Sequence, residues 1–375
     1  MSDGAGSVLV LGEALIDLVP DDRLPALRHA QPGGAPANVA VGLARLGTPA
    51  VFAGGVGGDA FGRTVEDWMR SAGVDTGLCA RSPLPTALAV ADPGPDGTGY
   101  HFHLRDTATF RLPEVTAELV SGFGAVYAGG LAAVVEPAAG AVAAAAREAA
   151  GHGLLVVDPN VREATDGDGA SLRELCALAH VVKASDEDLA RLWPGAEPSA
   201  SAGRLAAQGR LVVMTRGALG STAFLPSAAQ VSVPAVPVEV VNSIGAGDAF
   251  MAAVLAWLGA AGLLRRGGPA GLGPDLAGAM LSYAAGVAAA VCGQSGGGGG
   301  RPPRPPPPPR GAPGQRRAEA GGGFSSPPPR GGRGGGGPRG GGAAPGPPTR
   351  RSASGPEDSP VAIGLTSTRE YSSAR

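Results

Sequence analysis

Asp248 and the three small residues before it form the segment most suited to chemistry. In VVNSIGAGDAF, residues 240–250, a strand-like stretch gives way to Gly245-Ala246-Gly247 and then to a long apolar helix. Glycines let the backbone approach a ligand closely, and the free N–H groups of a first helical turn favour an anion. A carboxylate facing that anion is unfavourable unless it has a task, such as accepting the proton of an attacking hydroxyl. The alternative is an ordinary glycine-rich turn with Asp248 as the helix N-cap.

A second small-residue segment, QPGGAPANVA at residues 31–40, is suited to a polar ligand. Gly33 and Gly34 lead into a predicted helix whose first turn holds Asn38, and its amide can both donate to and accept from a hydroxyl. Asp17 interrupts an otherwise apolar stretch and is a further candidate. The alternative for residues 31–40 is a plain loop followed by a helix start. The alternative for Asp17 is a solvent-facing strand residue.

Alternating strand and helix patterns predict the elements that position these residues. Repeated strand–helix units favour an α/β fold with a mainly parallel sheet and helices on both faces. Residues 13–31 and 86–112 do not fit the alternation, and we expect their strands to form a small β flap, or lid. The expected strands are 7–11, 49–56, 125–127, 154–157, 181–182 and 211–214, with a hairpin at 221–225 and 230–233. The expected helices are 38–46, 62–72, 138–150, 171–178, 186–192, 248–264 and 275–291.

Composition divides the chain at about residue 295. Residues 1–294 can form one domain, whereas 295–375 are rich in Gly, Pro and Arg, without periodic apolar residues, and we expect this tail to be disordered. Residues 296–375 hold twelve arginines and four acidic residues, while the whole chain has a net charge of −2. The body before the tail is therefore acidic.

The cysteines and the apolar segments favour a cytoplasmic protein. Three widely spaced cysteines suggest neither a disulfide framework nor a zinc site. The N-terminal sequence has no basic leader, and we expect no secretory signal. The uncharged run 249–264 is shorter than the roughly twenty residues of a membrane span. We expect no membrane partner.

The motifs, taken in order, resemble the ribokinase-like (PfkB-type) carbohydrate kinase family. GGAPANVA at 33–40, FAGGVGGDAFG at 52–62 and GAGD at 245–248 carry the resemblance, which covers about residues 7–293. GEALIDL at 12–18 and GGAPANVA are most similar to the fructokinase branch. The resemblance implies a kinase that transfers the γ-phosphate of ATP to a sugar hydroxyl, with fructose as the first expectation. It also implies Mg²⁺ with the ATP, room for a monovalent cation, and a lid through which a homodimer could form.

The resemblance assigns roles to single residues. Asp248 matches the family's general base, and the amides of Gly245, Ala246 and Gly247 would stabilise the transferring phosphoryl group. No GxxxxGK[ST] loop is present, so transfer would depend on positioning and electrostatics. The residues implied to bind the sugar are Asp17, Gly33, Gly34, Asn38, Arg105 and Arg162. For the two arginines the alternative is a solvated surface side chain.

The nucleotide side is represented by KASDED at 183–188 and TRGALG at 215–220. The first resembles the family's segment for magnesium and phosphate, which usually ends in Glu, and Asp188 stands there; it could act through metal-bound water. The family usually has Asp-Thr where this chain has Asn242-Ser243. The residues implied to bind the nucleotide are Lys183, Ser185, Thr215, Gly217, Gly220 and Asn242.

Other interpretations remain open at this point. A 2-keto-3-deoxygluconate kinase or another sugar kinase would use Arg105 and Arg162 to bind a carboxylate. The unusual sequence after Cys292 is compatible with a catalytically impaired kinase fold. Arginine and glycine in RGGRGG at 330–335 suggest RNA binding, but the tail holds only Phe324 and Tyr371 to stack on bases, so a nucleic-acid partner is not expected.

Overall fold

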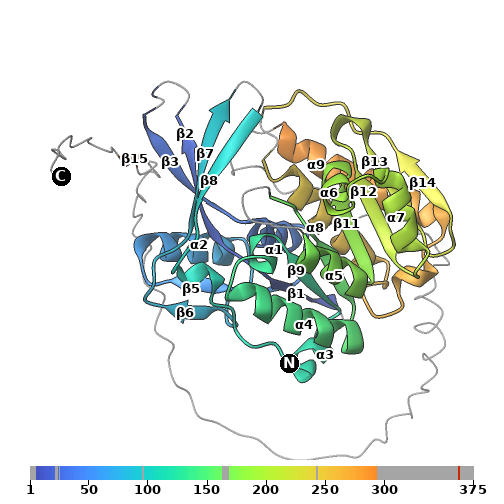
Figure 1. Cartoon of the computed structure of the whole chain (residues 1–375), viewed down its shortest axis with the longest axis horizontal. Coiled ribbons are helices and arrows are strands. Elements are labelled where there is room, and N and C mark those ends of the chain that lie inside the picture. The colour runs from blue at the N-terminus through green and yellow to red at the C-terminus, as the bar shows by residue number, and fades with distance from the viewer. Residues whose placement is uncertain are drawn as a thin grey trace, which may run out of the picture.

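The structure, a computed structural model, describes residues 6–293 except 22–23, 25, 95–96, 163–168 and 242–243, together with residues 362–363. Its central sheet has eight strands in the order β14-β13-β12-β11-β10-β9-β1-β4 (Figure 1). All neighbours from β4 to β12 are parallel, and β13 and β14 add an antiparallel edge. The strands are β1 (Val8–Leu11), β4 (Ala50–Ala53), β9 (Ala125–Gly129), β10 (Leu155–Asp158), β11 (Val181–Ser185), β12 (Leu211–Thr215), β13 (Ser221–Phe224) and β14 (Gln230–Val233).

Helices cover both faces of this sheet, which is why its parallel strands are continuously apolar. In β1, Val8 and Val10 point into one core and Leu9 and Leu11 into the other, as the alternation of strand side chains requires. The first core is covered by α1 (Ala35–Arg45), α2 (Ala60–Ser71), α8 (Ala246–Ala260) and α9 (Pro274–Cys292). The second is covered by α3 (Ala117–Ser121), α4 (Ala138–His152), α5 (Ala170–Leu178), α6 (Asp186–Leu192) and α7 (Pro198–Ala206). The predicted α/β class is confirmed.

A second sheet stands apart from the main sheet and forms the lid (Figure 1). Within residues 6–293 its strands are β2 (Leu15–Pro20), β3 (Arg28–Gly33), β7 (Leu88–Gly94) and β8 (Gly97–His103). β2 pairs with β3 antiparallel and with β7 parallel, while β7 and β8 form a hairpin. The lid is therefore built from the two stretches of sequence that did not fit the alternation.

The sequence patterns did not predict several short elements, and they predicted one helix to be longer than it is. β5 (Gly55–Gly57) and β6 (Ala80–Ser82) form a small parallel sheet. α3 has only five residues, and α7 was missed because its sequence, PSASAGRLA, has few large apolar residues. α8 ends at Ala260 rather than at residue 264, because Gly262 adopts the left-handed conformation with φ of 70° and the chain turns there.

α9 is the one helix in the described part of the chain that is long and apolar enough to cross a membrane. This criterion uses length and composition only, and a core helix also meets it. Met280, Leu281 and Ala284 of α9 are buried in the core that also contains α8. About a third of its apolar window, 33%, is buried in the domain, so packing accounts for one side of the helix.

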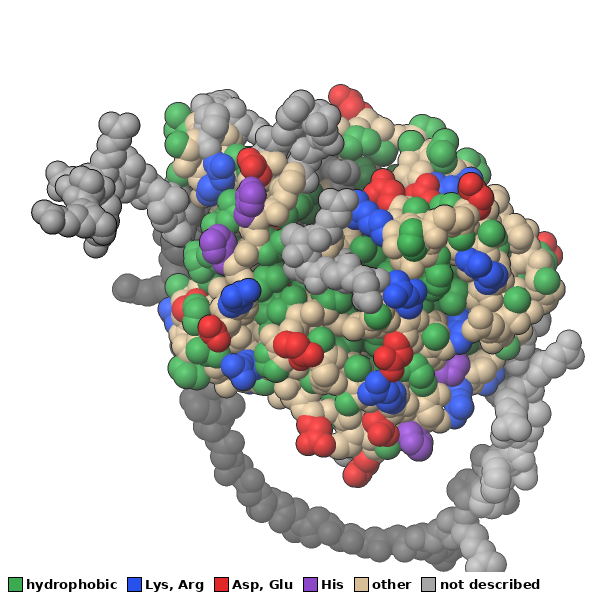
Figure 2. Space-filling model, in the orientation of Figure 1, with side chains coloured by type: hydrophobic (Ala, Val, Ile, Leu, Met, Phe, Trp, Pro, Cys, Tyr) green, Lys and Arg blue, Asp and Glu red, His purple; other side chains and the backbone are tan. Residues whose placement is uncertain are grey.

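The outer surface carries charges of both signs. On the face in Figure 2, Lys and Arg side chains are interspersed with Asp and Glu side chains over the described residues. Beyond residue 293, the described residues are Ala362–Ile363, which form β15 and pair antiparallel with His29 and Arg28 of β3. The remainder of the predicted tail lies outside the described residues.

Candidate active site

A cavity of about 410 Å³ lies between the lid and the carboxyl ends of the central strands. Ligands of open α/β sheets typically bind at this edge, outside the carboxyl ends of the strands. The lid, the start of α1, the segment after β10 and the start of α8 all contribute to the lining. Of the residues predicted from the sequence, the lining includes Asp17, Gly34, Asn38, Arg162, Lys183, Gly245, Gly247 and Asp248.

The turn before α8 places Asp248 in this cavity. Gly245 is the N-cap of α8 and has φ of 78°, a left-handed conformation that favours glycine. The helix begins at Ala246, so Asp248 lies in its first turn beside free backbone N–H groups. The glycine at position 245 is thus required by the backbone, and Asp248 is fixed by the helix start.

Asn38 binds the carboxylate of Asp248 directly, although 210 residues separate them. Its side-chain amide donates to Asp248 Oδ2 at 2.8 Å. Burial raises the pKa of Asp248 above its ordinary value, while the Asn38 hydrogen bond and the charges of Lys183 and Arg162 oppose the rise. Asp248 is therefore a half-buried carboxylate with increased proton affinity, held in one orientation by Asn38.

The two glycines before α1 allow Asp17 and Glu13 to approach. A Cβ at Gly33 would lie 2.0 Å from Asp17 Oδ2, and one at Gly34 would lie 2.7 Å from the Glu13 carbonyl oxygen. Gly34 also has φ of 101°. Burial raises the pKa of Asp17 to about 6, with a further contribution from Asp248 and an opposing one from Arg162. The backbone therefore requires glycine at position 34, whereas a side chain at position 33 would displace the Asp17 carboxylate.

Lys183 forms a buried ion pair at the base of the cavity. Its Nζ lies 2.9 Å from Asp158 Oδ2, and both side chains are almost completely buried. A Cβ at Gly247 would lie 3.3 Å from Lys183 Nζ, so the ammonium is next to the first turn of α8. Burial alone would lower the pKa of Lys183, but the carboxylates of Asp158 and Asp188 raise it. The positive charge is therefore retained beside the predicted phosphoryl site.

Glu13 is a site residue that the sequence patterns did not identify. It follows β1, lines the cavity and is only 1% exposed. Its Oε2 accepts the backbone N–H of Ala132 at 3.0 Å, and burial raises its pKa to about 7. The available signal for Glu13 was a charged residue within the apolar run that follows Leu11. A charge at the buried end of a strand is unfavourable, so it indicates a functional role.

The lid adds an aromatic wall that was also not assigned to the site. Tyr100 and Phe102 of β8 line the cavity, and their rings stack with centroids 6.0 Å apart and planes at 16°. The neighbouring His101 and His103 are exposed on the opposite face of the strand. The alternating sequence YHFH was the signal for this arrangement.

The predicted nucleotide residues outside the cavity lie at the ends of adjacent strands. Ser185 ends β11 and is in register with Thr215, the last residue of β12. Gly217 begins the short helix after β12, and Gly220 follows it with φ of 89°; a Cβ there would lie 2.2 Å from the Val233 carbonyl oxygen. Asn242 lies outside the described residues.

Asp188 has a structural task in the described chain. Its two carboxylate oxygens accept the N–H groups of Val161 and Ser185 at 2.9 and 2.8 Å. Ser185 Oγ in turn accepts the Asp188 N–H at 2.9 Å, which completes a capping box at the start of α6. The carboxylate keeps further lone pairs, so it remains able to accept from water.

Arg105 is not brought to the cavity. It lies in an exposed turn after β8, whereas Arg162 lines the cavity and is close enough to influence Asp17 and Asp248. The difference arises because β8 ends at His103 and the chain turns away from the lid at Arg105. Of the two predicted arginines, only Arg162 is near the other site residues.

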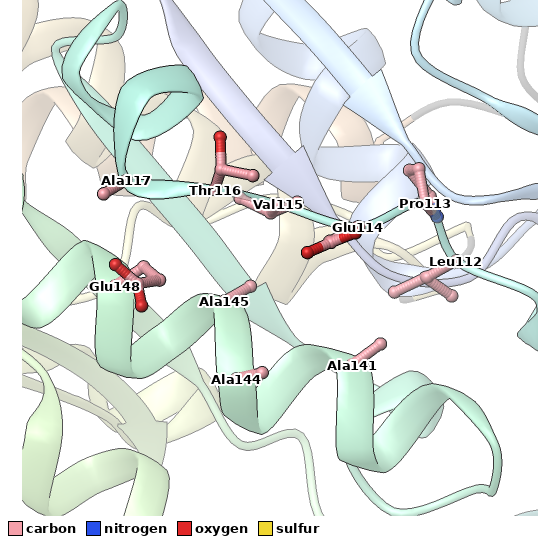
Figure 3. Close-up of a pocket in the computed structure, with 10 residues that line it drawn as sticks. All are labelled: Leu112, Pro113, Glu114, Val115, Thr116, Ala117, Ala141, Ala144, Ala145 and Glu148. Carbon is pink, nitrogen blue, oxygen red and sulfur yellow. The ribbon is translucent and has the colours of Figure 1, made fainter.

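A second cavity, of about 500 Å³, lies between residues 112–117 and one side of α4 (Figure 3). Glu114 and Glu148 are its acidic side chains, and the α4 side presents Ala141, Ala144 and Ala145. None of the residues predicted for chemistry lies in it. The first cavity therefore remains the candidate active site.

A parallel sheet between two helical layers, a β lid and an Asp-bearing glycine turn together define the class of ribokinase-like small-molecule kinases. The chain matches the family model described as pfkB family carbohydrate kinase over residues 5–303. It belongs to this family, and is therefore a carbohydrate kinase. The resemblance stated from the motifs is confirmed.

The relatives include several fructokinases. The fructokinase of Klebsiella pneumoniae is 38% identical over 285 residues, which are 72% of this chain and 90% of the relative. A solved structure of fructokinase with bound ATP from Xylella fastidiosa has a TM-score of 0.68 and 29% identity, and covers 78% of this chain and 94% of that chain. A solved structure of fructokinase from Vibrio cholerae O395, in the form with bound fructose, ADP and calcium ion, has a TM-score of 0.65 and 27% identity. The match covers 78% of this chain and 95% of that chain.

Proposed function

We propose that this carbohydrate kinase is an ATP-dependent fructokinase with Asp248 as its general base. The observation that carries the proposal is the half-buried Asp248 carboxylate, fixed by Asn38 at the start of α8 inside the cavity. The similarity to fructokinases supports fructose as the substrate. Within the family, the site chemistry alone would suit other sugars as well.

In the proposed reaction, Asp248 accepts the proton of a sugar hydroxyl while that oxygen attacks the γ-phosphorus. The new O–P bond replaces the bond to the β,γ-bridging oxygen, and ADP leaves. Burial raises the pKa of Asp248, which makes its carboxylate a stronger base than an exposed aspartate. The N–H groups of Gly245, Ala246 and Gly247 stabilise the charge on the transferring group.

The sugar is proposed to bind between the lid and α1. Asp17 and Asn38 supply hydrogen-bonding groups, and Gly34 leaves room for the ligand beside them. Tyr100 and Phe102 provide an apolar face that covers the C–H groups of the ring. Arg162 lines the cavity and is positioned to hold the phosphates of ATP, because fructose is neutral.

ATP is proposed to lie along the ends of β11 and β12, with its phosphates directed to Lys183. Ser185, Thr215, Gly217 and Gly220 are the residues on that path, because Ser185 and Thr215 are register partners at the strand ends. The adjacent segment is apolar and exposed, with Val238 at 41% and Val240 at 62%. Nucleotide binding would cover part of this surface.

Mg²⁺ would enter with the ATP phosphates. No group of three or more His, Cys, Asp or Glu side chains that could hold a metal occurs in the part of the chain that the structure describes. The site nevertheless fits Mg²⁺, which commonly keeps several waters and uses one carboxylate together with substrate phosphates. Asp188 would hold it through water, and the ion would neutralise phosphate charge during transfer.

The substitution Asp248→Asn tests the base. We expect kcat to fall about a thousandfold while the KM values for sugar and ATP change little, because the amide keeps the shape but cannot accept the proton. ADP release under saturating substrates is the measurement, and Asp67→Asn, at an exposed position of α2, is the control. Wild-type turnover in Asp248→Asn would remove Asp248 from this role.

A panel of acceptors tests the substrate. Fructose should have a higher kcat/KM than ribose, adenosine or 2-keto-3-deoxygluconate. The keto-deoxy acid is the informative competitor, because Arg162 in the cavity could bind its carboxylate. If this acid is preferred and Arg162→Ala abolishes the preference, fructose is the wrong substrate.

A further inference from the structure

The ion pair of Lys183 and Asp158 has features that packing alone does not explain. The two residues lie on the adjacent strands β11 and β10, with Asp158 1% and Lys183 6% exposed. Replacing a buried ion pair with apolar residues is often neutral or stabilising, because removing two charges from water is costly. A pair kept at the bottom of a cavity therefore invites a functional explanation.

Asp158 is also incompletely satisfied. Its Oδ2 accepts from Lys183 Nζ at 2.9 Å, but its Oδ1 is buried without a hydrogen-bond partner. An unpaired buried carboxylate oxygen carries a desolvation cost that a purely structural site would avoid. What the arrangement does provide is one fixed contact, between Asp158 and the ammonium of Lys183.

The choice of lysine is unusual in this chain. Lys183 is its single lysine, against 29 arginines. The place beside Gly247 is narrow, because a Cβ there would lie only 3.3 Å from Lys183 Nζ. A guanidinium is larger and planar, whereas an ammonium is a compact point charge. A compact ammonium therefore suits the position against Gly247 at the edge of the cavity.

We propose that Asp158 is a positioning residue that holds the ammonium of Lys183 against the first turn of α8, where the phosphoryl group is transferred. The inference rests on the proposed kinase reaction and adds a residue to it. Asp158 is not among the residues that line the cavity, whereas Lys183 is. It acts by fixing the position of a compact cation, and a larger, planar guanidinium at position 183 would not reproduce that position.

Three substitutions test the inference in the full chain. Asp158→Asn should lower kcat and the kcat/KM for ATP by about tenfold to a hundredfold, while the KM for fructose stays within about twofold. Lys183→Met should lose at least as much, and Lys183→Arg should not restore activity although it keeps the charge. Because the residues act as one unit, the double variant Asp158→Asn/Lys183→Met should be no worse than Lys183→Met alone. Glu174→Gln, which removes the exposed Arg147–Glu174 pair, is the matched control and should behave as wild type.

Two outcomes would overturn the inference. One is wild-type kcat in Asp158→Asn together with loss in Lys183→Met, and the other is full activity in Lys183→Arg. Should Asp158→Asn fail to fold, Asp158→Glu keeps the charge and shifts the carboxylate by one methylene. That variant should still lose kcat if position matters, and normal kcat would contradict the proposal.

A readout independent of activity uses the single lysine. Labelling with ¹⁵N-lysine gives one side-chain ammonium signal, which the buried pair should protect from fast exchange with water. We expect the signal in wild type and its shift or loss in Asp158→Asn, both without substrates. An unchanged signal would refute the pairing. Failure of wild type on every sugar would instead refute the proposed function, with the signal still reporting on the pair.

Discussion

Four buried or half-buried carboxylates surround the candidate site, and their environments differ. Burial is the main cause of the raised pKa values of Glu13, Asp17, Asp158 and Asp248. The charges that oppose the rise at Asp248 belong to Lys183 and Arg162. The site therefore gathers carboxyl groups in buried surroundings, and their proton affinity is set by burial more than by local sequence. Such a concentration is costly to the fold and typical of functional sites.

Glu13→Gln should reveal this cost as a pH dependence of stability. The pKa of Glu13 is about 7 in the folded protein and near 4.5 in the unfolded chain, so its contribution to stability is intact below about pH 4.5 and falls as pH rises to about 7. One pKa unit is worth about 1.4 kcal/mol, so ionisation costs up to about 3 kcal/mol. As the pH rises from 4.5 to 8, the free energy of unfolding of Glu13→Gln should increase by up to that amount relative to wild type.

Urea unfolding at the two pH values measures the effect. Glu174→Gln on the surface is the control and should show no such gain. If the difference between Glu13→Gln and wild type is the same at both pH values, Glu13 does not hold its proton in the folded state.

At the scale of elements, the lid determines how the cavity is closed. β2 and β3 bring Asp17 and the Gly33-Gly34 pair to the site, while β7 and β8 add the aromatic wall. Tyr100 and Phe102 alternate with His101 and His103, so one face of β8 meets the cavity and the other meets solvent. A strand with period-two alternation thus gives the lid an apolar inner surface and a polar outer one.

Phe102→Ala should weaken sugar binding more than catalysis. Loss of the buried ring surface should raise the KM for fructose about tenfold, with little change in the KM for ATP. His101→Ala, on the outer face of the same strand, is the matched control and should leave both KM values unchanged. Steady-state kinetics with each substrate varied in turn is the measurement. An unchanged KM for fructose in Phe102→Ala would mean that the lid's inner face does not contact the sugar.

At the scale of the whole molecule, both cores are formed by residues 8–287. α8 and α9 pack together in one of them, and the backbone N–H of Val241 donates to the carbonyl of Cys292 at 2.9 Å. The segment beyond the domain contributes β15, whose two residues pair with β3 of the lid. The stability of the domain should therefore depend on α9 and very little on the residues after Gly293.

A chain that ends at Gly293 should unfold within about 2 °C of the full chain, since one two-residue strand pair adds little to stability. Its kcat for the preferred sugar should also be unchanged. A chain that ends at Gly273, which lacks α9, is the control and should lose cooperative unfolding because the α8 core face becomes exposed. Calorimetry checks both. A large drop in melting temperature for the Gly293 chain would show that the tail stabilises the domain.

The sequence by itself determined the features of this protein that depend on neighbouring residues, namely its turns, its helix starts and the alternation of strands and helices. Gly245 and Asp248 were identified because turn geometry and helix starts depend on neighbouring residues, and the α/β class followed from alternating apolar patterns. The lid was predicted because residues 13–31 and 86–112 broke that alternation. The family resemblance then assigned roles to Asp17 and Asn38, which the structure brings to one cavity.

Tertiary structure alone decided the contacts between distant segments. No local pattern could place Asn38 2.8 Å from Asp248 across 210 residues, or pair Asp158 with Lys183 on neighbouring strands. The burial of Glu13 and the exposure of Arg105 likewise depend on the segments that pack against each residue. Local sequence fixes the conformation of a segment, but the proton affinity and the partners of a side chain are fixed by the low-dielectric surroundings that only the assembled fold creates.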